Sequence, residues 1–308
     1  MKRYFATAVD LTLGHVLARA NEFDAAVAEG RVFIGKRRAF SVWEPLVAGD
    51  EIVVHPPTAV PEGVVVLSSA EGLHAVAKPV GLSTEPDRRG GTSLVARAAE
   101  LLGVPPKSLH AATRLDAAVS GIVVVAEGPD AAKLVESLKR SGRLRRRYVA
   151  IAAGAPSPSD GTWSVPIGTG PRGRPVANGK DARPATTEYR TAWSGVASGR
   201  TITALVLEPV TGRSHQLRIH AAEAGAPLYG DAQRGGPTRF VSNDGAVTAI
   251  SRVLLHAGRI RARLPSGAWS VTFPPPGDFS SFLVSVGGDP AVVAAALDEP
   301  FLDGRAPA

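Results

Sequence analysis

Residues 114–121 of this 308-residue chain combine an ionisable pair with the start of an apolar run. Arg114-Leu115-Asp116 precedes Ser120-Gly121, and the four residues that follow are Ile, Val, Val and Val. Charged side chains seldom lie against such a buried run unless they are paired or take part in chemistry. The partner of Asp116 therefore decides which function the sequence predicts.

A second block, residues 211–220 (TGRSHQLRIH), gathers hydrogen-bond donors at the expected start of a helix. The free N–H groups of a helix N-terminus add to these donors, so the block suits a phosphate or a carboxylate. A solvated, capped helix face is the alternative. The side-chain donors are Arg213, His215, Gln216, Arg218 and His220.

A third block, residues 143–150 (RLRRRYVA), leads a basic run into a strand whose first aromatic residue is Tyr148. Arginines beside an aromatic ring favour nucleic acid, through phosphate contacts and base stacking. An exposed basic loop with a core tyrosine is the alternative.

Several other kinds of site are disfavoured. The chain has no cysteine, which excludes disulfides and thiolate sites. His215 and His220 are five residues apart, which does not stack them on one helical face as metal ligands. No second carboxylate accompanies Asp116 between residues 109 and 126, as a glycosidase would need. Ser120 lacks the Gly-x-Ser-x-Gly context of a nucleophile and is interpreted as a turn residue.

The composition indicates a globular protein with a polyanionic partner. Lys and Arg total 35 against 28 Asp and Glu, a net charge of +7, which favours nucleic acid. The first residues lack the apolar stretch of a signal peptide, and no segment is long enough to span a bilayer. We therefore expect cytoplasmic localisation and no membrane partner.

The elements that must position these blocks are mainly short strands divided by Gly and Pro turns. This pattern predicts an α+β fold with a mixed, largely antiparallel sheet and flanking helices. Segment 168–185 is rich in Gly, Pro, Arg and Lys and predicts a mobile basic loop. We expect strands at 64–67, 73–77, 121–126, 148–153, 186–191, 202–208, 258–263 and 269–273, and helices at 93–102, 129–141, 216–224 and 289–297.

Residues 1–56 form a separate small unit, which a proline-containing linker at 57–63 connects to the rest. Helices are expected at 11–18 and 24–29, and strands at 31–34 and 51–54, with a basic turn at 35–38. This order resembles an S4-type RNA-binding domain. A generic α+β cap is the alternative.

Five ordered blocks over residues 10–283 together resemble the RluA-type pseudouridine synthases, which often carry an S4-like module. Residues 64–285 would then be the catalytic domain, and 286–308 a C-terminal helix and tail. The matching blocks are Lys78-Pro79-Val80-Gly81-Leu82, Arg114-Leu115-Asp116 with Ser120-Gly121, Arg147-Tyr148-Val149-Ala150, residues 211–220 with Pro227-Leu228-Tyr229-Gly230-Asp231, and Leu255-His256-Ala257 before a proline-rich stretch.

The chain departs from the family pattern His-Arg-Leu-Asp-Arg-x-Thr-Ser-Gly at three positions. Thr113, Ala117 and Val119 stand where the family has His, Arg and Thr. These changes remove polar groups beside the proposed reacting residue, which bears on substrate identity and efficiency.

The resemblance implies a cofactor-free isomerisation of uridine in RNA, with Asp116 as nucleophile or base near C1′. Arg218 would pair with Asp116, and Tyr148 would stack on the base and is a candidate for proton abstraction at C5. Arg114 would fill the gap left by the flipped uridine, Leu255 would line the pocket floor, and basic loops would hold phosphates. The implied substrate-binding residues are Arg114, Leu255, Arg213, His215, Gln216, Lys78 and Arg147.

Large-subunit ribosomal RNA is the expected partner by family analogy, with tRNA as the alternative, and we expect a monomer. The main rival function is a catalytically silent RNA-binding or ribosome-assembly protein that retains the fold. A carboxylate-based hydrolase acting on RNA or nucleosides is disfavoured because no second carboxylate accompanies Asp116.

Overall fold

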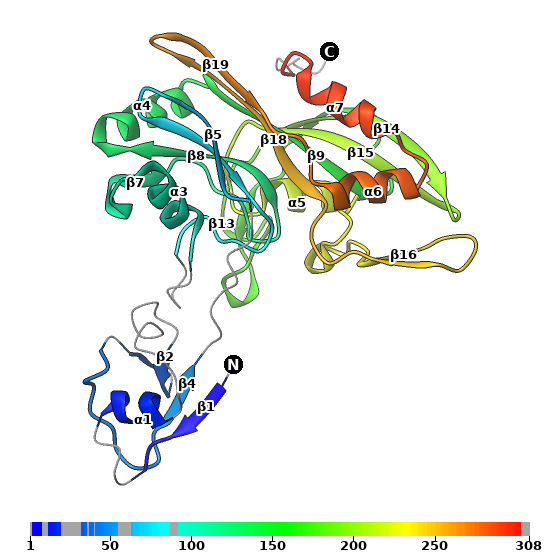
Figure 1. Cartoon of the computed structure of the whole chain (residues 1–308). Helices are drawn as coiled ribbons and strands as arrows, with labels where there is room; N and C mark the ends of the chain where they lie inside the picture. Colours follow the sequence, from blue (N-terminus) through cyan, green and yellow to red (C-terminus); the bar gives the residue numbers. More distant parts are fainter. Residues whose placement is uncertain are drawn as a thin grey trace.

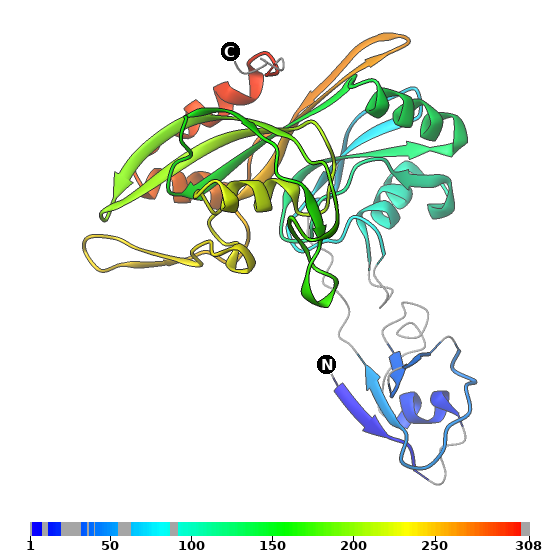
Figure 2. The ribbon, with the colours of Figure 1, turned by 180° about the vertical axis from the view of Figure 1, so that it is seen from behind.

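The computed structural model describes residues 2–7, 12–19, 32–35, 37–39, 41–54, 63–86 and 92–302. Most of these residues belong to a mixed, largely antiparallel sheet with flanking helices, which confirms the predicted fold class (Figures 1 and 2). Among the described residues, no helix is both long enough and apolar enough to cross a bilayer.

The N-terminal residues form a small antiparallel sheet of order β1-β4-β2-β3 with one helix packed on it. Leu13 of the helix and Ile52 of the sheet are both fully buried in its core. The helix predicted at 24–29 lies outside the described residues, and the S4-like assignment stays a prediction. The elements are β1 (Lys2–Phe5), α1 (Leu13–Arg19), β2 (Val32–Ile34), β3 (Arg37–Arg38) and β4 (Glu51–Val54).

The large sheet has the order β10-β14-β15-β9-β18-β8-β6-β5, with β19 paired to β18 and β7 to β8. The eight strands predicted for this region are all present, while β7 and β10 were not predicted. The strands are β5 (Val65–Ala70), β6 (Leu73–Lys78), β7 (Leu109–Ala111), β8 (Ser120–Glu127), β9 (Leu144–Ala153), β10 (Asp160–Trp163), β14 (Thr187–Ala197), β15 (Arg200–Pro209), β18 (Leu255–Leu264) and β19 (Gly267–Thr272).

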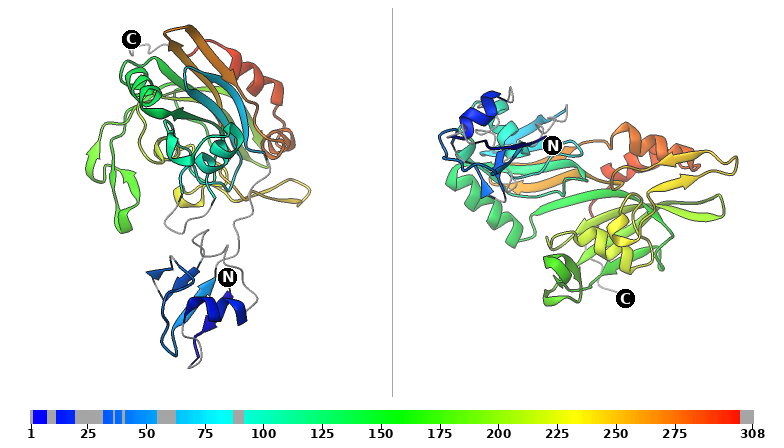
Figure 3. Two further views of the ribbon diagram at one scale, coloured as in Figure 1. Left: turned by 60° about the vertical axis from the view of Figure 1, so that its left-hand side comes forward. Right: turned by 90° about the horizontal axis from the view of Figure 1, so that it is seen from below.

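Helices cover both faces of this sheet (Figure 3). Helices α3 and α5 pack on one face, α4 and the pair α6 and α7 on the other. Helix α6 was not predicted because it follows three prolines, which disfavour a helix up to its first turn. The helices are α3 (Leu94–Leu102), α4 (Gly128–Arg140), α5 (Gln216–Glu223), α6 (Gly277–Ser285) and α7 (Pro290–Asp298), with 3-10 turns η1 (Pro106–Ser108), η2 (Pro171–Gly173) and η3 (Ala232–Arg234).

Strand β9 divides its side chains between the two faces with the two-residue period of a strand. Tyr148 and Ala150 belong to the core beneath α3 and α5, whereas Val149 and Ile151 belong to the core beneath α6 and α7. By the same alternation, Arg146 lies on the face of Tyr148, and Arg145 and Arg147 lie on the face of Val149.

The prediction of a loop over the whole of 168–185 is wrong, because half of these residues lie in strands of a three-stranded antiparallel sheet of order β12-β11-β13. Its strands are short, and all of β13 is exposed, so the segment shows little hydrophobic periodicity. A two-stranded ribbon, β16 with β17, was also not predicted. These strands are β11 (Ile167–Thr169), β12 (Pro175–Ala177), β13 (Lys180–Arg183), β16 (Arg239–Val241) and β17 (Val247–Ala249).

Strands β8 and β18 pair in parallel at two residue pairs, His256 with Ser120 and Ala257 with Gly121. The two β8 residues follow Asp116 closely in the chain. Gly121 is required there, because a Cβ atom would lie 2.3 Å from the Ala257 carbonyl oxygen. Beside it, the Ser120 hydroxyl lies 2.9 Å from Nδ1 of His256, and Nε2 of His256 lies 2.8 Å from the Phe273 carbonyl oxygen. This buried contact ties the start of β8 to the C-terminal half of the sheet.

Residues 296–302 form a C-terminal strap, which consists of the end of α7 and the residues that follow it. The fully buried Arg147 pairs with Glu208 at 2.6 Å and donates hydrogen bonds to the carbonyl groups of the strap. The Phe301 ring lies over the guanidinium groups of Arg145, Arg147 and Arg259. Breaking a buried pair of this kind costs about 3–5 kcal/mol, so the strap is part of the packed fold.

We predict that His256 makes the protein sensitive to acid. Burial lowers the pKa of His256 from 6.5 to about 4. Between pH 6.5 and pH 4 this histidine therefore binds a proton in the unfolded chain but not in the folded chain. The free energy of unfolding thus falls as the pH approaches 4. Urea unfolding at pH 8 and pH 5 measures the loss of unfolding free energy between the two pH values. In His256→Gln this loss should be smaller than in the natural protein by about 2 kcal/mol. Equal losses in the variant and the natural protein would contradict the prediction.

Candidate functional site

A cavity of about 1000 Å³ opens on the sheet face that carries α3 and α5. Six segments line it: residues 83–86, the loop 111–119 before β8, the C-terminal end of α4, the start of β9, the segment 209–218 that leads into α5, and Leu255 at the start of β18. The cavity lies where strands from both halves of the sheet meet, and it contains Asp116, Tyr148 and Arg218.

Asp116 and Arg218 form an ion pair in this cavity, although 102 residues separate them in the chain. Nη1 of Arg218 donates to Oδ2 of Asp116 at 2.7 Å. The Asp116 side chain is 28% exposed and that of Arg218 only 7%. Burial alone would lower the pKa of the Arg218 guanidinium, but hydrogen bonds and charges from Asp231 and Asp116 outweigh it and raise the pKa. The cation beside Asp116 is therefore permanent.

The loop that carries Asp116 is fixed by backbone contacts on both sides of the carboxylate. The Thr84 hydroxyl donates to the Leu115 carbonyl at 2.9 Å and accepts from the Leu115 amide at 3.1 Å. The ammonium group of Lys78 donates to the carbonyl oxygens of Pro79 and Leu82. Lys78 is only 1% exposed, so its predicted substrate contact is wrong: it stabilises the turn beside this loop.

His215 lies beside Asp116 in a constrained backbone conformation. Its φ of 56° is uncommon for a residue with a side chain, and such residues gather at functional sites. Nε2 lies 3.8 Å from Oδ1 of Asp116, and the buried Nδ1 has no hydrogen-bond partner among the described residues. Burial is the main cause that lowers the pKa of His215, so the imidazole is neutral at pH 7 and can accept a proton.

Gln216 is buried and makes all its hydrogen bonds within the protein, so we assign it to positioning rather than to the predicted substrate contact. Its amide nitrogen donates to the Thr186 carbonyl and the Thr187 hydroxyl, while its oxygen accepts from the Thr211 hydroxyl and the Arg213 amide. Arg213 itself is exposed at the cavity mouth, where a phosphate could reach it.

Arg146 and Arg147, adjacent on β9, lie on opposite faces of the sheet. Arg146 shares the face of Tyr148, lines the cavity and donates from Nη2 to the Thr211 carbonyl oxygen at 3.3 Å. Arg147 is fully buried against Glu208 and the C-terminal strap. The predicted RNA contact of Arg147 is therefore wrong, because its side chain has no surface for a phosphate.

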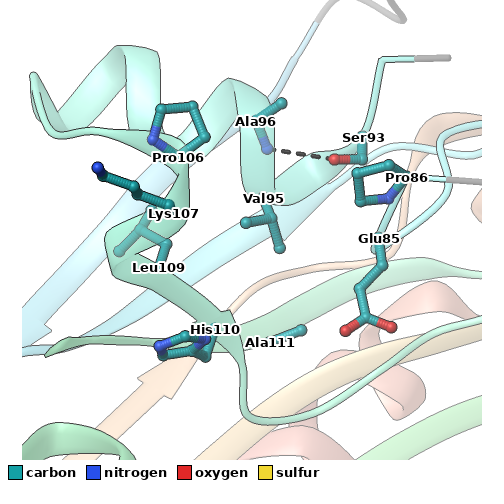
Figure 4. A pocket seen from close by; sticks show the side chains of 10 residues that line it. All are labelled: Glu85, Pro86, Ser93, Val95, Ala96, Pro106, Lys107, Leu109, His110 and Ala111. Atoms are coloured by element: carbon teal, nitrogen blue, oxygen red, sulfur yellow. Dashed lines mark hydrogen bonds between the residues drawn. The ribbon is translucent and has the colours of Figure 1, made fainter. Parts of the chain in front are cut away.

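Arg114 and Leu255 both line the cavity. Arg114 is exposed and lies 3.1 Å from a carboxylate oxygen of Glu85, whereas Leu255 is buried within the cavity wall. Glu85 also borders a second, smaller cavity between α3 and β7, drawn in Figure 4. There the Ser93 hydroxyl accepts from the Ala96 amide and caps α3. Glu85, Pro86 and Ala111 line both cavities.

Two of the three positions that depart from the family pattern have structural roles. The Thr113 hydroxyl accepts a hydrogen bond from the Val124 amide at 2.9 Å, and Val119 is buried in the core beneath α3 and α5. Ala117 is exposed at the cavity wall. Compared with the family pattern, these three residues carry less charge beside the cavity, but the Asp116–Arg218 contact is present.

Two residues of this site, Asp231 and Thr84, had been given no role of their own from the sequence. Arg146 belonged to the basic run expected to hold phosphates, and its place on the cavity face follows from the strand period, because it lies two residues before Tyr148. Asp231 closes the family block 227–231, and it forms a two-point hydrogen-bonded pair with Arg218. Thr84 had no sequence signal, since its contact with Leu115 exists only in the folded chain.

Comparison with known proteins identifies the family. A family model described as RNA pseudouridylate synthase matches residues 72–223. The dual-specificity RNA pseudouridine synthase RluA of Salmonella typhimurium is 34% identical over 220 residues, which cover 70% of this chain and 94% of that protein. Human RNA pseudouridylate synthase domain containing 4 has the same fold, with a TM-score of 0.57 and 24% identity over 74% of this chain and 94% of its own.

We predict that the two adjacent arginines of β9 have separable effects. Among the described residues Arg146 forms no ion pair, so its charge is available to a phosphate. Arg146→Gln should weaken RNA binding and reduce the slope of log affinity against log salt by about 1.

Arg147→Gln is the matched control. It should lower the free energy of unfolding by about 3–5 kcal/mol while the folded protein keeps the salt slope of the natural chain. RNA binding measured at four salt concentrations, together with urea unfolding, checks both variants. A reduced slope in Arg147→Gln alone would overturn the assignment of faces.

Proposed function

Because the chain belongs to the RNA pseudouridylate synthase family, we propose that Asp116 is the residue through which it isomerises uridine in RNA. The observation that carries this proposal is the environment of the carboxylate. Oδ2 is held by Arg218, while Oδ1 accepts no hydrogen bond from the described residues and faces the cavity with His215 at 3.8 Å. Asp116 thus faces a permanent cation, is oriented by it and is open on one side.

The reaction exchanges one bond for another without net oxidation. The N1–C1′ bond of uridine breaks, and its electron pair leaves with the base. The base then rotates, C5 forms a bond to C1′, and the proton on C5 is lost while N1 gains one. A carboxylate beside C1′ can act as the nucleophile or the base that this sequence needs.

Tyr148 is suited to hold the base rather than to remove the C5 proton. Burial raises the pKa of its phenol, and the negative charge of Asp116 acts in the same direction against Arg146. A neutral phenol is a poor proton acceptor at pH 7, but its ring lies in the cavity wall, where a base could stack. The neutral imidazole of His215, whose Nε2 lies 3.8 Å from Asp116, can accept that proton instead.

The exposed arginines at the cavity mouth would bind the RNA around the flipped uridine. Arg114 stands at the rim, where its weak, solvent-exposed contact with Glu85 is easily exchanged for RNA. It would fill the space left in the RNA stack and offset part of an unstacking cost of a few kcal/mol. Arg213 and Arg146 would contact neighbouring phosphates.

We propose large-subunit ribosomal RNA as the first target to test, with tRNA as the alternative. The S4-like order of the N-terminal elements supports ribosomal RNA by analogy. The relative from Salmonella typhimurium is named dual-specificity, so both classes of RNA should be assayed. Incubation of each purified RNA, followed by chemical mapping of pseudouridine, identifies the target. Modification of tRNA alone would contradict the ribosomal assignment.

We predict that Asp116→Asn abolishes turnover. The amide has no negative charge to attack C1′ or to accept a proton, so the rate of pseudouridine formation should fall at least about ten-thousandfold. The nearly isosteric change should leave the melting temperature and the RNA affinity close to those of the natural protein. Turnover by this variant near the natural rate would exclude Asp116 as the reacting residue.

A further inference from the structure

Strands β9 and β18 carry a ladder of paired arginines on the face of the sheet opposite the cavity. Side chains that lie opposite each other on adjacent strands point to the same face, and like charges in such pairs destabilise a sheet. A ladder of this kind therefore needs anions close by. The register pairs Arg147 with Arg259 and Arg145 with Arg261, and the Arg263 amide continues it by donating to the Arg143 carbonyl oxygen at 3.3 Å.

One half of the ladder is compensated inside the protein. Glu208 pairs with both Arg145 and Arg147, and Glu188 also pairs with Arg145. Carbonyl oxygens of the C-terminal strap accept hydrogen bonds from Arg145, Arg147 and Arg259. These three arginines are therefore committed to the fold.

The other half, Arg143, Arg261 and Arg263, forms what we call the outer arginine surface. All three side chains are exposed, and within the described part of the chain none of them forms an ion pair or a side-chain hydrogen bond. Strand β19 places only uncharged residues beside them, Ser270 opposite Arg261 and Ala268 opposite Arg263. The charge of this surface is thus open to an anion from outside.

The acidic side chains at the β18–β19 hairpin are engaged elsewhere. Oε1 of Glu71 accepts from the Ser266 amide in the hairpin turn at 2.8 Å. Oδ1 of Asp298 lies 3.4 Å from the Thr272 hydroxyl, which is opposite Arg259 in the covered half of the ladder. Neither carboxylate pairs with the outer arginine surface.

The outer arginine surface begins where the cavity ends. Helix α4 ends at the exposed Arg140, which lines the cavity. The Arg143 amide donates to the Leu138 carbonyl at 2.8 Å and fixes the turn into β9. The alternation of β9 then places Arg143 on the face opposite to Arg146. A polyanion that leaves the cavity past Arg140 therefore meets Arg143 and then the arginines of β18.

We propose that the outer arginine surface binds phosphate groups of the RNA beyond the cavity, so that the strand passes round the end of α4 from one face of the sheet to the other. Arg261 and Arg263 are two residues apart on β18, so their Cα atoms lie about 7 Å apart, and a row of phosphates can contact both. This inference rests on the proposed action on RNA, but it does not involve Asp116.

A membrane surface is the other polyanion that such arginines could meet, and the structure favours RNA. Membrane-surface binding needs apolar side chains that enter the lipid beside the basic ones. Over the described residues of β18 and β19, no large apolar side chain is exposed. The surface thus offers charge without an apolar anchor.

The test is Arg261→Gln/Arg263→Gln in the full-length protein, with RNA affinity measured at several salt concentrations. The probes are single-stranded RNAs of about 5 and about 40 nucleotides, the longer of which contains the shorter around a central uridine. Each phosphate contact adds about 0.7 to the slope of log affinity against log salt, so the slope should fall by about 1.4 with the long RNA and stay unchanged with the short one.

Arg200→Gln/Arg239→Gln is the matched control. It removes the same charge from two exposed arginines that begin β15 and β16, at the end of the domain away from the β18–β19 hairpin (Figures 1 and 2). Both slopes should keep their natural values in this variant. The melting temperature of Arg261→Gln/Arg263→Gln should not fall, because the substitutions remove like charges from the ladder.

An unchanged slope with the long RNA, an equal fall with the short RNA, or an equal fall in the control would overturn the proposal. A lowered melting temperature with unchanged slopes would show a structural role instead. Unchanged slopes with lost binding to phosphatidylglycerol vesicles would assign the surface to a membrane. Natural turnover in Asp116→Asn would refute the proposed role of Asp116 but leave the slopes, which need no turnover, as a valid test.

Discussion

The ion pairs of Arg218 connect three segments that are distant in the chain. A guanidinium with only 7% of its side chain exposed is costly to remove from water unless its carboxylates are already in place. Asp116 comes from the loop before β8, Arg218 from α5, and Asp231 from the loop after α5. The site therefore forms only when the sheet is complete, and the geometry of the cavity depends on these contacts.

The arginines of the basic run on strand β9 have two different roles, one on each face of the sheet. The face with Arg146 and Tyr148 lines the cavity, and the face with Arg145 and Arg147 anchors the C-terminal strap. Arginine serves both because its planar group can meet a phosphate at a surface or carboxylate and carbonyl oxygens in the interior. The basic composition is thus only partly an RNA-binding feature.

Sequence reasoning succeeded where the local pattern determines the structure. The apolar run of β8 and the helix at 129–141 follow from periodicity, and the meeting of Asp116 with Arg218 came from the family resemblance. It failed for Arg147, because adjacency to Tyr148 was given more weight than the alternation of a strand. It also failed for segment 168–185, whose strands are solvent-exposed and therefore carry little hydrophobic signal. The contacts of Lys78 and Thr84 depend on the folded arrangement of distant backbone.

The C-terminal strap is held mostly through its main chain. Arg147 donates to the carbonyl groups of Ala296, Glu299 and Pro300, and the Leu302 amide donates to Glu208. Carbonyl groups are the same in every residue, so this anchoring is blind to most side chains of the strap. Phe301, which three guanidinium groups contact, and the buried Ala296 and Leu297 are the exceptions. In evolution, the exposed residues 298–300 should thus be free to vary, whereas Phe301 and the arginines around it should change together or not at all.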